Sequence, residues 1–271
     1  MKRFKNVLCV VEDEASSQTA LQRAVDLASN NQASLTAIAV VPPMTFGMGM
    51  PESGPVYSDL QDALLREHEQ RIKKLVDPYR GQIEIRSGVL LGIPFLEVIR
   101  EVLRGDYDLV IKGPEAPDWL DRIFTGDDMH LLRKCPCAVW LVNPETGGSC
   151  ERILAAVDVD DNYPPAELET RQRLSESIME VAGALAVSEF AQLHVVHTWA
   201  AIGESVMRNG AFLNHTEDEI NTYVEEVRRH HADSLDELME RARTRLGADA
   251  FDYIKPQRHL LKGSARREIP A

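Results

Sequence analysis

Short apolar runs alternate with longer amphipathic stretches along most of the chain. The first run, Lys5 to Glu12, is continuously apolar between its polar ends, as expected for a β-strand buried on both faces of a sheet. The stretch that follows repeats small apolar residues at helical spacing, and Ser16 or Ser17 stands where a helix N-cap is expected. This pattern predicts a strand followed by a helix.

The same alternation continues through the first half of the chain. Further strands are expected at Ala33–Val41, Gln82–Val89, Tyr107–Lys112 and Ala138–Val142, and further helices from Tyr57, from Pro94 and over Ile123–Arg133. Strands separated by helices are typical of a parallel sheet with right-handed crossovers. The first half therefore predicts one complete five-stranded α/β domain.

The second half repeats the order of the first. Val7–Glu12 is echoed by Ile153–Asp158, and Ala33–Val41 is echoed by Ala191–Trp199. A repeat of this length indicates duplicated domains rather than a solenoid of short units.

The repeat predicts a first domain over residues 1–145 and a second over residues 151–271, because Asn143–Cys150 has the composition of a linker. In the second domain we expect strands at Arg152–Asp158, Leu193–Thr198 and Gln257–Leu261, and helices at Pro165–Val187 and Thr216–Leu246. Residues 263–271 only begin a third helix. The second domain is therefore expected to lack its last two strands.

The charge balance narrows the range of partners. A formal net charge of -13 repels phosphate backbones and anionic membranes, so neither nucleic acid nor a membrane is expected as a partner. No apolar run approaches the roughly 20 residues of a membrane span. The N-terminus leads into the first strand without a signal-peptide pattern, which favours a cytoplasmic location.

Few residues suggest metal or catalytic chemistry. Cys135 and Cys137 resemble a metal or redox pair, but a spacing of one residue, without a second pair of ligands nearby, favours a structural role. His194 and His197 are three residues apart on one strand and should point to opposite faces, so they cannot chelate one metal. Sequence motifs of nucleophilic or zinc-dependent hydrolases are absent. We expect neither an enzyme nor a metal site.

Particular residues within this order resemble the universal stress protein family in its tandem form. They are the first-strand runs ending Val-Val-Glu and Ala-Val-Asp, the Leu-His-Val-Val-His of Leu193–His197, the Val-Leu-Leu-Gly-Ile-Pro of Val89–Pro94 and the closing run Cys135–Val142. The resemblance covers nearly the whole chain. It implies two tandem, doubly wound parallel-sheet α/β domains of the Rossmann-like, adenine nucleotide alpha hydrolase-like class. It also implies, as in some members, ATP binding at the carboxyl ends of the strands.

The resemblance places one candidate ATP site in the first domain. Members that bind ATP carry Gly-x2-Gly-x9-Gly-Ser/Thr after the fourth strand, where this chain has Gly113, Ala116, Gly126 and Asp127. Glycines let the backbone approach phosphates, whereas a carboxylate competes for the same N–H groups and repels a polyphosphate. Glu12 stands where the family's acid bonds adenine. We expect poor ATP binding here, and Asp127 and Asp128 can instead cap a helix that begins at Met129.

The second domain matches the base-binding end of the family site better. Asp158 stands at the first-strand acid position, and Val195 stands where the backbone faces adenine in relatives. Asp158 can equally be a strand-end residue that accepts hydrogen bonds from nearby amides. The phosphate loop would follow Ala271, so ATP is expected only in the second domain of a full-length chain.

The resemblance implies a role in stress response through binding of a ligand or protein partner. Two alternatives stay open: an ATP-binding protein with slow ATPase activity, and a carrier of an apolar ligand. The strand Ala138–Val142 is an apolar edge in the first domain, and an unpaired edge is a template for pairing. We therefore expect a homodimer formed through that strand.

Overall fold

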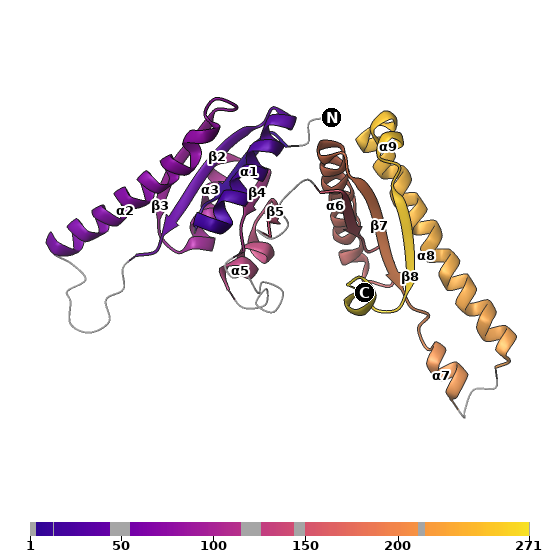
Figure 1. Cartoon of the computed structure of the whole chain (residues 1–271). Coiled ribbons are helices and arrows are strands. Elements are labelled where there is room, and N and C mark those ends of the chain that lie inside the picture. Colours follow the sequence, from indigo (N-terminus) through magenta and orange to yellow (C-terminus); the bar gives the residue numbers. More distant parts are fainter. Residues whose placement is uncertain are drawn as a thin grey trace. The chain divides into compact units, whose positions relative to one another are not determined.

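The computed structural model describes residues 4–12, 14–43, 55–114, 126–143, 150–210 and 215–270. The chain divides into two compact units, residues 2–148 and 149–271, and each contains its own sheet (Figure 1).

The first unit is a parallel sheet of five strands in the order β3-β2-β1-β4-β5. Its strands are β1 Asn6–Val10, β2 Ser34–Val41, β3 Ile85–Leu91, β4 Leu109–Lys112 and β5 Ala138–Leu141. Its helical segments are α1 Glu14–Asn31, α2 Pro55–Val76, the 3-10 turn η1 Asp77–Tyr79, α3 Pro94–Gly105 and α5 Asp127–Lys134. The strand order reverses between β1 and β4, and this topological switch point is where sheets of this class bind ligands.

Helices cover both faces of this sheet. Right-handed crossovers place α1 and α2 on one face and α3 and α5 on the other. On the second face, Val98 and Val102 of α3 and Leu131 of α5 pack against Leu8 and Val10 of β1. Burial on both faces explains why β1 reads as an unbroken apolar run.

The second unit has a parallel sheet of three strands in the order β6-β7-β8 among its described residues. Its strands are β6 Arg152–Ala156, β7 Gln192–Trp199 and β8 Gln257–Lys262. Its helices are α6 Pro165–Glu189, α7 Glu204–Asn209, α8 Glu217–Leu246, α9 Ala248–Ile254 and α10 Ala265–Glu268. The long helices α6 and α8 pack on one face of this sheet, where Met179, Leu235 and Leu238 join a core with Leu193 and Val195.

Backbone hydrogen bonds show that the two units repeat each other. The amide of Val11 donates to Ile38, as that of Val157 donates to Val196. These pairs make Glu12 and Asp158 equivalent.

A second pair of bonds extends the repeat. Gly92 donates to Val41 as Gly263 donates to Trp199. Both glycines have positive φ, +152° and +141°, and in each a Cβ would lie within 3 Å of the glutamate five residues on. The duplication therefore reaches from the first strand to the turn after the third.

The predicted parallel α/β fold is confirmed, and some details differ. The predicted N-cap is wrong, because α1 begins at Glu14 and Ser17 lies within it. Helices α7 and α9 had no counterpart in the prediction, whereas Thr216 caps α8 with a complete capping box. No helix in the described parts of the chain is long and apolar enough to cross a membrane.

Candidate functional site

Three charged side chains meet at the switch point of the first unit. Lys112 ends β4 with only 3% of its side chain exposed. Its Nζ lies 2.8 Å from Oε1 of Glu12, which follows β1, and 2.6 Å from Oδ1 of Asp128 in the first turn of α5. Both carboxylates are therefore bound to a cation of the chain itself.

Burial and pairing act in opposite directions on these groups. Burial alone would lower the pKa of Lys112, but the carboxylates of Glu12 and Asp128 outweigh it and raise that pKa above its usual range. Burial raises the pKa of Glu12, and Lys112 only partly offsets this. The ammonium is therefore firmly charged, whereas protonation of Glu12 is favoured relative to a carboxyl in water.

A cavity of about 380 Å³ lies at the equivalent place in the second unit. Apolar atoms come from Ala156, Val157, Leu174, Ile178, Ala265 and Ile269, and polar groups from Asp158, Asp160, Tyr163, Arg171, His197 and Thr198. A mostly apolar cleft with a few convergent polar groups is the usual form of a small-molecule site.

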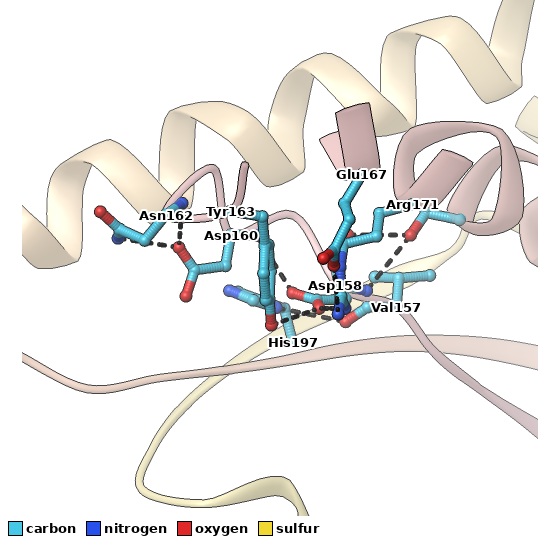
Figure 2. A network of polar contacts seen from close by, with 9 residues as sticks. Val157, Asp158, Asp160, Asn162, Tyr163, Glu167, Arg171 and His197 are labelled. Carbon is cyan, nitrogen blue, oxygen red and sulfur yellow. Dashed lines mark hydrogen bonds and ion pairs between the residues drawn. The ribbon is translucent and has the colours of Figure 1, made fainter. Parts of the chain in front are cut away.

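Asp158 is the centre of the polar side of this cavity (Figure 2). Its Oδ2 accepts from the hydroxyl of Tyr163 at 3.2 Å and from the guanidinium of Arg171 at 3.1 Å. Its Oδ1 accepts from the backbone N–H of Asp160 at 3.1 Å. The Arg171 guanidinium also lies over the Tyr163 ring, 3.5 Å from its centroid. These contacts fix the carboxylate and build a flat cationic and aromatic surface beside it.

Asp160 adds a second carboxylate to the site. Burial alone would raise its pKa, but the backbone and side-chain N–H groups of Asn162 donate to it and lower the pKa below its usual range. The cavity therefore presents two acids to a ligand, of which Asp160 is firmly ionised.

An insertion supplies this polar cluster. In both units the N–H of the strand-end acid donates to a serine hydroxyl of the following helix, at 2.9 Å for Glu12 and Ser17 and at 3.2 Å for Asp158 and Ser175. The serine follows five residues after the acid in the first unit and 17 residues after it in the second. Tyr163 lies in the loop before α6 and Arg171 lies in α6 itself, both between Asp158 and Ser175. The five-residue spacing of the first unit leaves no room for equivalents of them.

Two buried histidines are in contact with each other, and one of them, His197, lines the cavity. His197 Nδ1 lies 3.2 Å from the carbonyl of Val157, and its Nε2 lies 3.1 Å from Nδ1 of His231 on α8. A carbonyl only accepts, so His197 carries its proton on Nδ1 and its Nε2 accepts from His231. Burial lowers the pKa of His231, with His197 adding to the effect. The charged form of His231 is therefore disfavoured inside the fold.

A neighbouring cavity of about 360 Å³ shares Asp158, Asp160 and Arg171 with the first. It extends to α8, where Glu237 and Arg241 contribute to its lining. Asp158 and Arg171 thus contribute to both cavities.

Comparison with known proteins identifies the family. The model of the universal stress protein family matches residues 3–143. The chain belongs to the universal stress protein family. It is 29% identical over 191 residues to the universal stress protein E homolog of Haemophilus influenzae, covering 68% of this chain and 60% of that protein. It is 30% identical to universal stress protein E of Escherichia coli K12 over 60% of this chain and 53% of that protein. The chain thus spans little more than half the length of these relatives.

Solved structures support the fold over the whole chain. A protein of unknown function from Pseudomonas aeruginosa PAO1 aligns with a TM-score of 0.57 at 21% identity, covering 99% of this chain and 77% of that one. A universal stress protein from Archaeoglobus fulgidus aligns with a TM-score of 0.56 at 15% identity, covering 99% and 85%. At these identities the likeness concerns the fold alone.

The site residues predicted from the family resemblance lie in different parts of the structure. Asp158 lines the cavity of this universal stress protein, but Val195 lies in the core, two residues before the cavity residue His197. Glu12 lies in the ion cluster of the first unit. Gly113, which follows Lys112 in the chain, is buried. Gly126 is the N-cap of α5, with a φ of +153° that favours glycine. The predicted cap at Asp127 and Asp128 is therefore wrong, because both residues lie in the first turn of the helix.

Ala116, at the second glycine position of the family motif, lies outside the described residues. Lys112, Tyr163 and Arg171 were not predicted as site residues. Lys112 could have been found as a charged residue ending a buried apolar run. The other two could have been found from the longer spacing between Asp158 and its helix.

Proposed function

We propose that this chain acts in stress response by binding a small ligand in its second unit, without turnover. The observation that carries the proposal is the contrast between the units. At the switch point of the first, Lys112 binds both carboxylates, whereas the second keeps a cavity beside the equivalent acid, Asp158. The first unit then serves as a structural half.

The chemistry of the cavity favours a planar, hydrogen-bonding ligand such as the base of an adenine nucleotide. Asp158 and Asp160 offer carboxylates to an exocyclic amine, and Leu174, Ile178 and Ile269 offer apolar surface to the faces of a ring. Asp158 is already held by Arg171 and Tyr163, so a ligand amine replaces or shares existing hydrogen bonds. We therefore expect modest affinity, because the free energy gained on binding is the difference between the hydrogen bonds formed with the ligand and those it replaces.

The hydrogen bonds of Ser175 and His197 support binding rather than catalysis. Ser175 donates to the carbonyl of Asp158, and His197 is bonded to Val157 and His231. Neither Ser175 nor His197 therefore forms a nucleophile–base pair, and the hydroxyl of Tyr163 serves to hold the Asp158 carboxylate in place. Phosphate release from ATP would instead favour a slow ATPase, and co-purifying lipid would favour an apolar carrier.

The proposal is tested by titrating adenosine into the wild type and an Asp158→Asn variant by calorimetry. A hydrogen bond to a charged group contributes about 1.5–3 kcal/mol, so the variant should bind roughly 10- to 100-fold more weakly. Glu169→Gln is the matched control, because Glu169 lies on the same helix and pairs with Arg173 in solvent. Equal affinity in wild type and Asp158→Asn contradicts the proposed site. Nucleotide released by denaturing the purified protein identifies the ligand directly.

A further inference from the structure

Two cysteine side chains of the first unit lie side by side where α5 leads into β5. The Sγ atoms of Cys135 and Cys137 are 3.6 Å apart, with only Pro136 between them in the chain. A disulfide bond is about 2.0 Å long, so the sulfurs would need to approach by roughly 1.5 Å. A shift of this size is within reach of side-chain rotation at two adjacent, partly exposed positions.

The surroundings shift the pKa values of the two thiols in opposite directions. A hydrogen bond from Cys137 lowers the pKa of Cys135 to about 7, against the effect of burial. The same contact, together with burial, raises the pKa of Cys137. At neutral pH the pair therefore contains a substantial fraction of a thiolate beside a protonated thiol.

The remaining cysteines differ from this pair. Cys9 is fully buried in β1, and burial raises its pKa to about 12. Cys150 belongs to the second unit. Cys135 and Cys137 are therefore the two thiols that lie in contact within one unit.

We propose that Cys135 and Cys137 form a redox-active dithiol that reacts with low-molecular-weight disulfides such as oxidised glutathione. The Cys135 thiolate attacks one sulfur of the glutathione disulfide, forming a mixed disulfide and releasing one glutathione thiolate. The Cys137 thiol then gives up its proton, and its sulfur attacks Cys135 Sγ and expels the second glutathione thiolate. The dithiol is oxidised by two electrons, and one oxidised glutathione becomes two reduced ones.

This site is independent of the ligand cavity, because it lies in the other unit. The proposal adds a chemical response to oxidising conditions to a protein proposed above to act by binding. Reduction by excess glutathione would restore the dithiol, since a bond between residues this close in sequence is readily reversed.

The test counts free thiols in the full chain by mass spectrometry, after exposure to oxidised glutathione, acid quenching and alkylation under denaturing conditions. The sequence contains four cysteines. The wild type should lose two alkylatable thiols and retain no glutathione, and peptide mapping should link residues 135 and 137. Cys137→Ser should instead trap one glutathione on Cys135. Cys150→Ser is the matched control and should still form the internal link.

The pH dependence separates this chemistry from simple exposure. In Cys150→Ser, the alkylation rate of the pair should reach half its maximum near pH 7. A midpoint at the ordinary cysteine value of about 8.5 would contradict the assigned thiolate. Four alkylatable thiols after oxidation, a link through Cys9 or Cys150, or a stable glutathione adduct on the wild type would each overturn the proposal.

Discussion

Removing the charge of Lys112 should destabilise the first unit selectively. In Lys112→Met the side chain keeps a similar length but loses the ammonium that binds Glu12 and Asp128. Breaking a buried ion pair from one side costs about 3–5 kcal/mol, because a buried charge is left uncompensated. The side chains of Glu12 and Asp128 are 30% and 12% exposed, so water offsets part of this cost and the lower end, about 3 kcal/mol, applies.

Hydrogen exchange of the full chain measures this effect unit by unit, which a single unfolding curve of a two-unit protein does not. A loss of about 3 kcal/mol corresponds to roughly 100-fold faster exchange of β1 and β4 amides. Amides of β7 report on the second unit and should be unchanged. Lys73→Met, at an exposed lysine of α2, is the matched control.

A compensated variant separates charge from packing. In Lys112→Met combined with Glu12→Gln and Asp128→Asn, no charge is left unpaired, and replacing a whole buried ion cluster is often neutral. Most of the lost protection should therefore return. Exchange of β1 amides in Lys112→Met within tenfold of wild type, or an equal change in β7, would refute the reasoning.

Three further predictions concern acids, histidines and assembly. The pKa of Glu12 is higher in the folded state than in the unfolded state, so protonation of Glu12 favours the folded state. As the pH falls from neutral, β1 amides of the wild type should become better protected from exchange relative to those of Glu12→Gln. The opposite trend would contradict this prediction. The pKa of His231 lies below its ordinary value in the folded state, so its contribution to the stability of the second unit is present above about pH 6.5 and is lost as the pH falls. In His231→Gln, exchange of β7 amides should therefore depend less on pH in the acid range. Pairing through the β5 edge predicts a dimer in sedimentation, and a monomer at roughly tens of micromolar would exclude it.

The order of strands and helices could be predicted because it depends on periodicity, which the sequence states directly. A continuous apolar run such as β1 is compatible with few structures other than a strand buried on both faces. The predicted cap failed for a local reason. Ser17 was expected to cap α1 but lies inside it and receives the N–H of Glu12. A serine near a helix start supports either role, and the sequence alone does not decide between them.

The candidate site was only partly predictable, because its contacts join residues far apart in the chain. Asp158 could be placed from its strand-end position. Its partners depend on how the longer connection folds back, which brings Arg171 within reach from 13 residues away. Likewise, Lys112 and Glu12 are 100 residues apart, and only the pairing of β1 with β4 brings them together.

Hydrogen exchange with and without adenosine shows directly which unit binds the ligand. If the second unit holds the site, adenosine should slow exchange at the end of β6 and the start of α6, around Asp158 and Arg171. Peptides around Glu12 and Lys112 should not change. Protection around Glu12 and Lys112 instead would contradict the assignment and mean that the ion cluster of the first unit opens to admit adenosine.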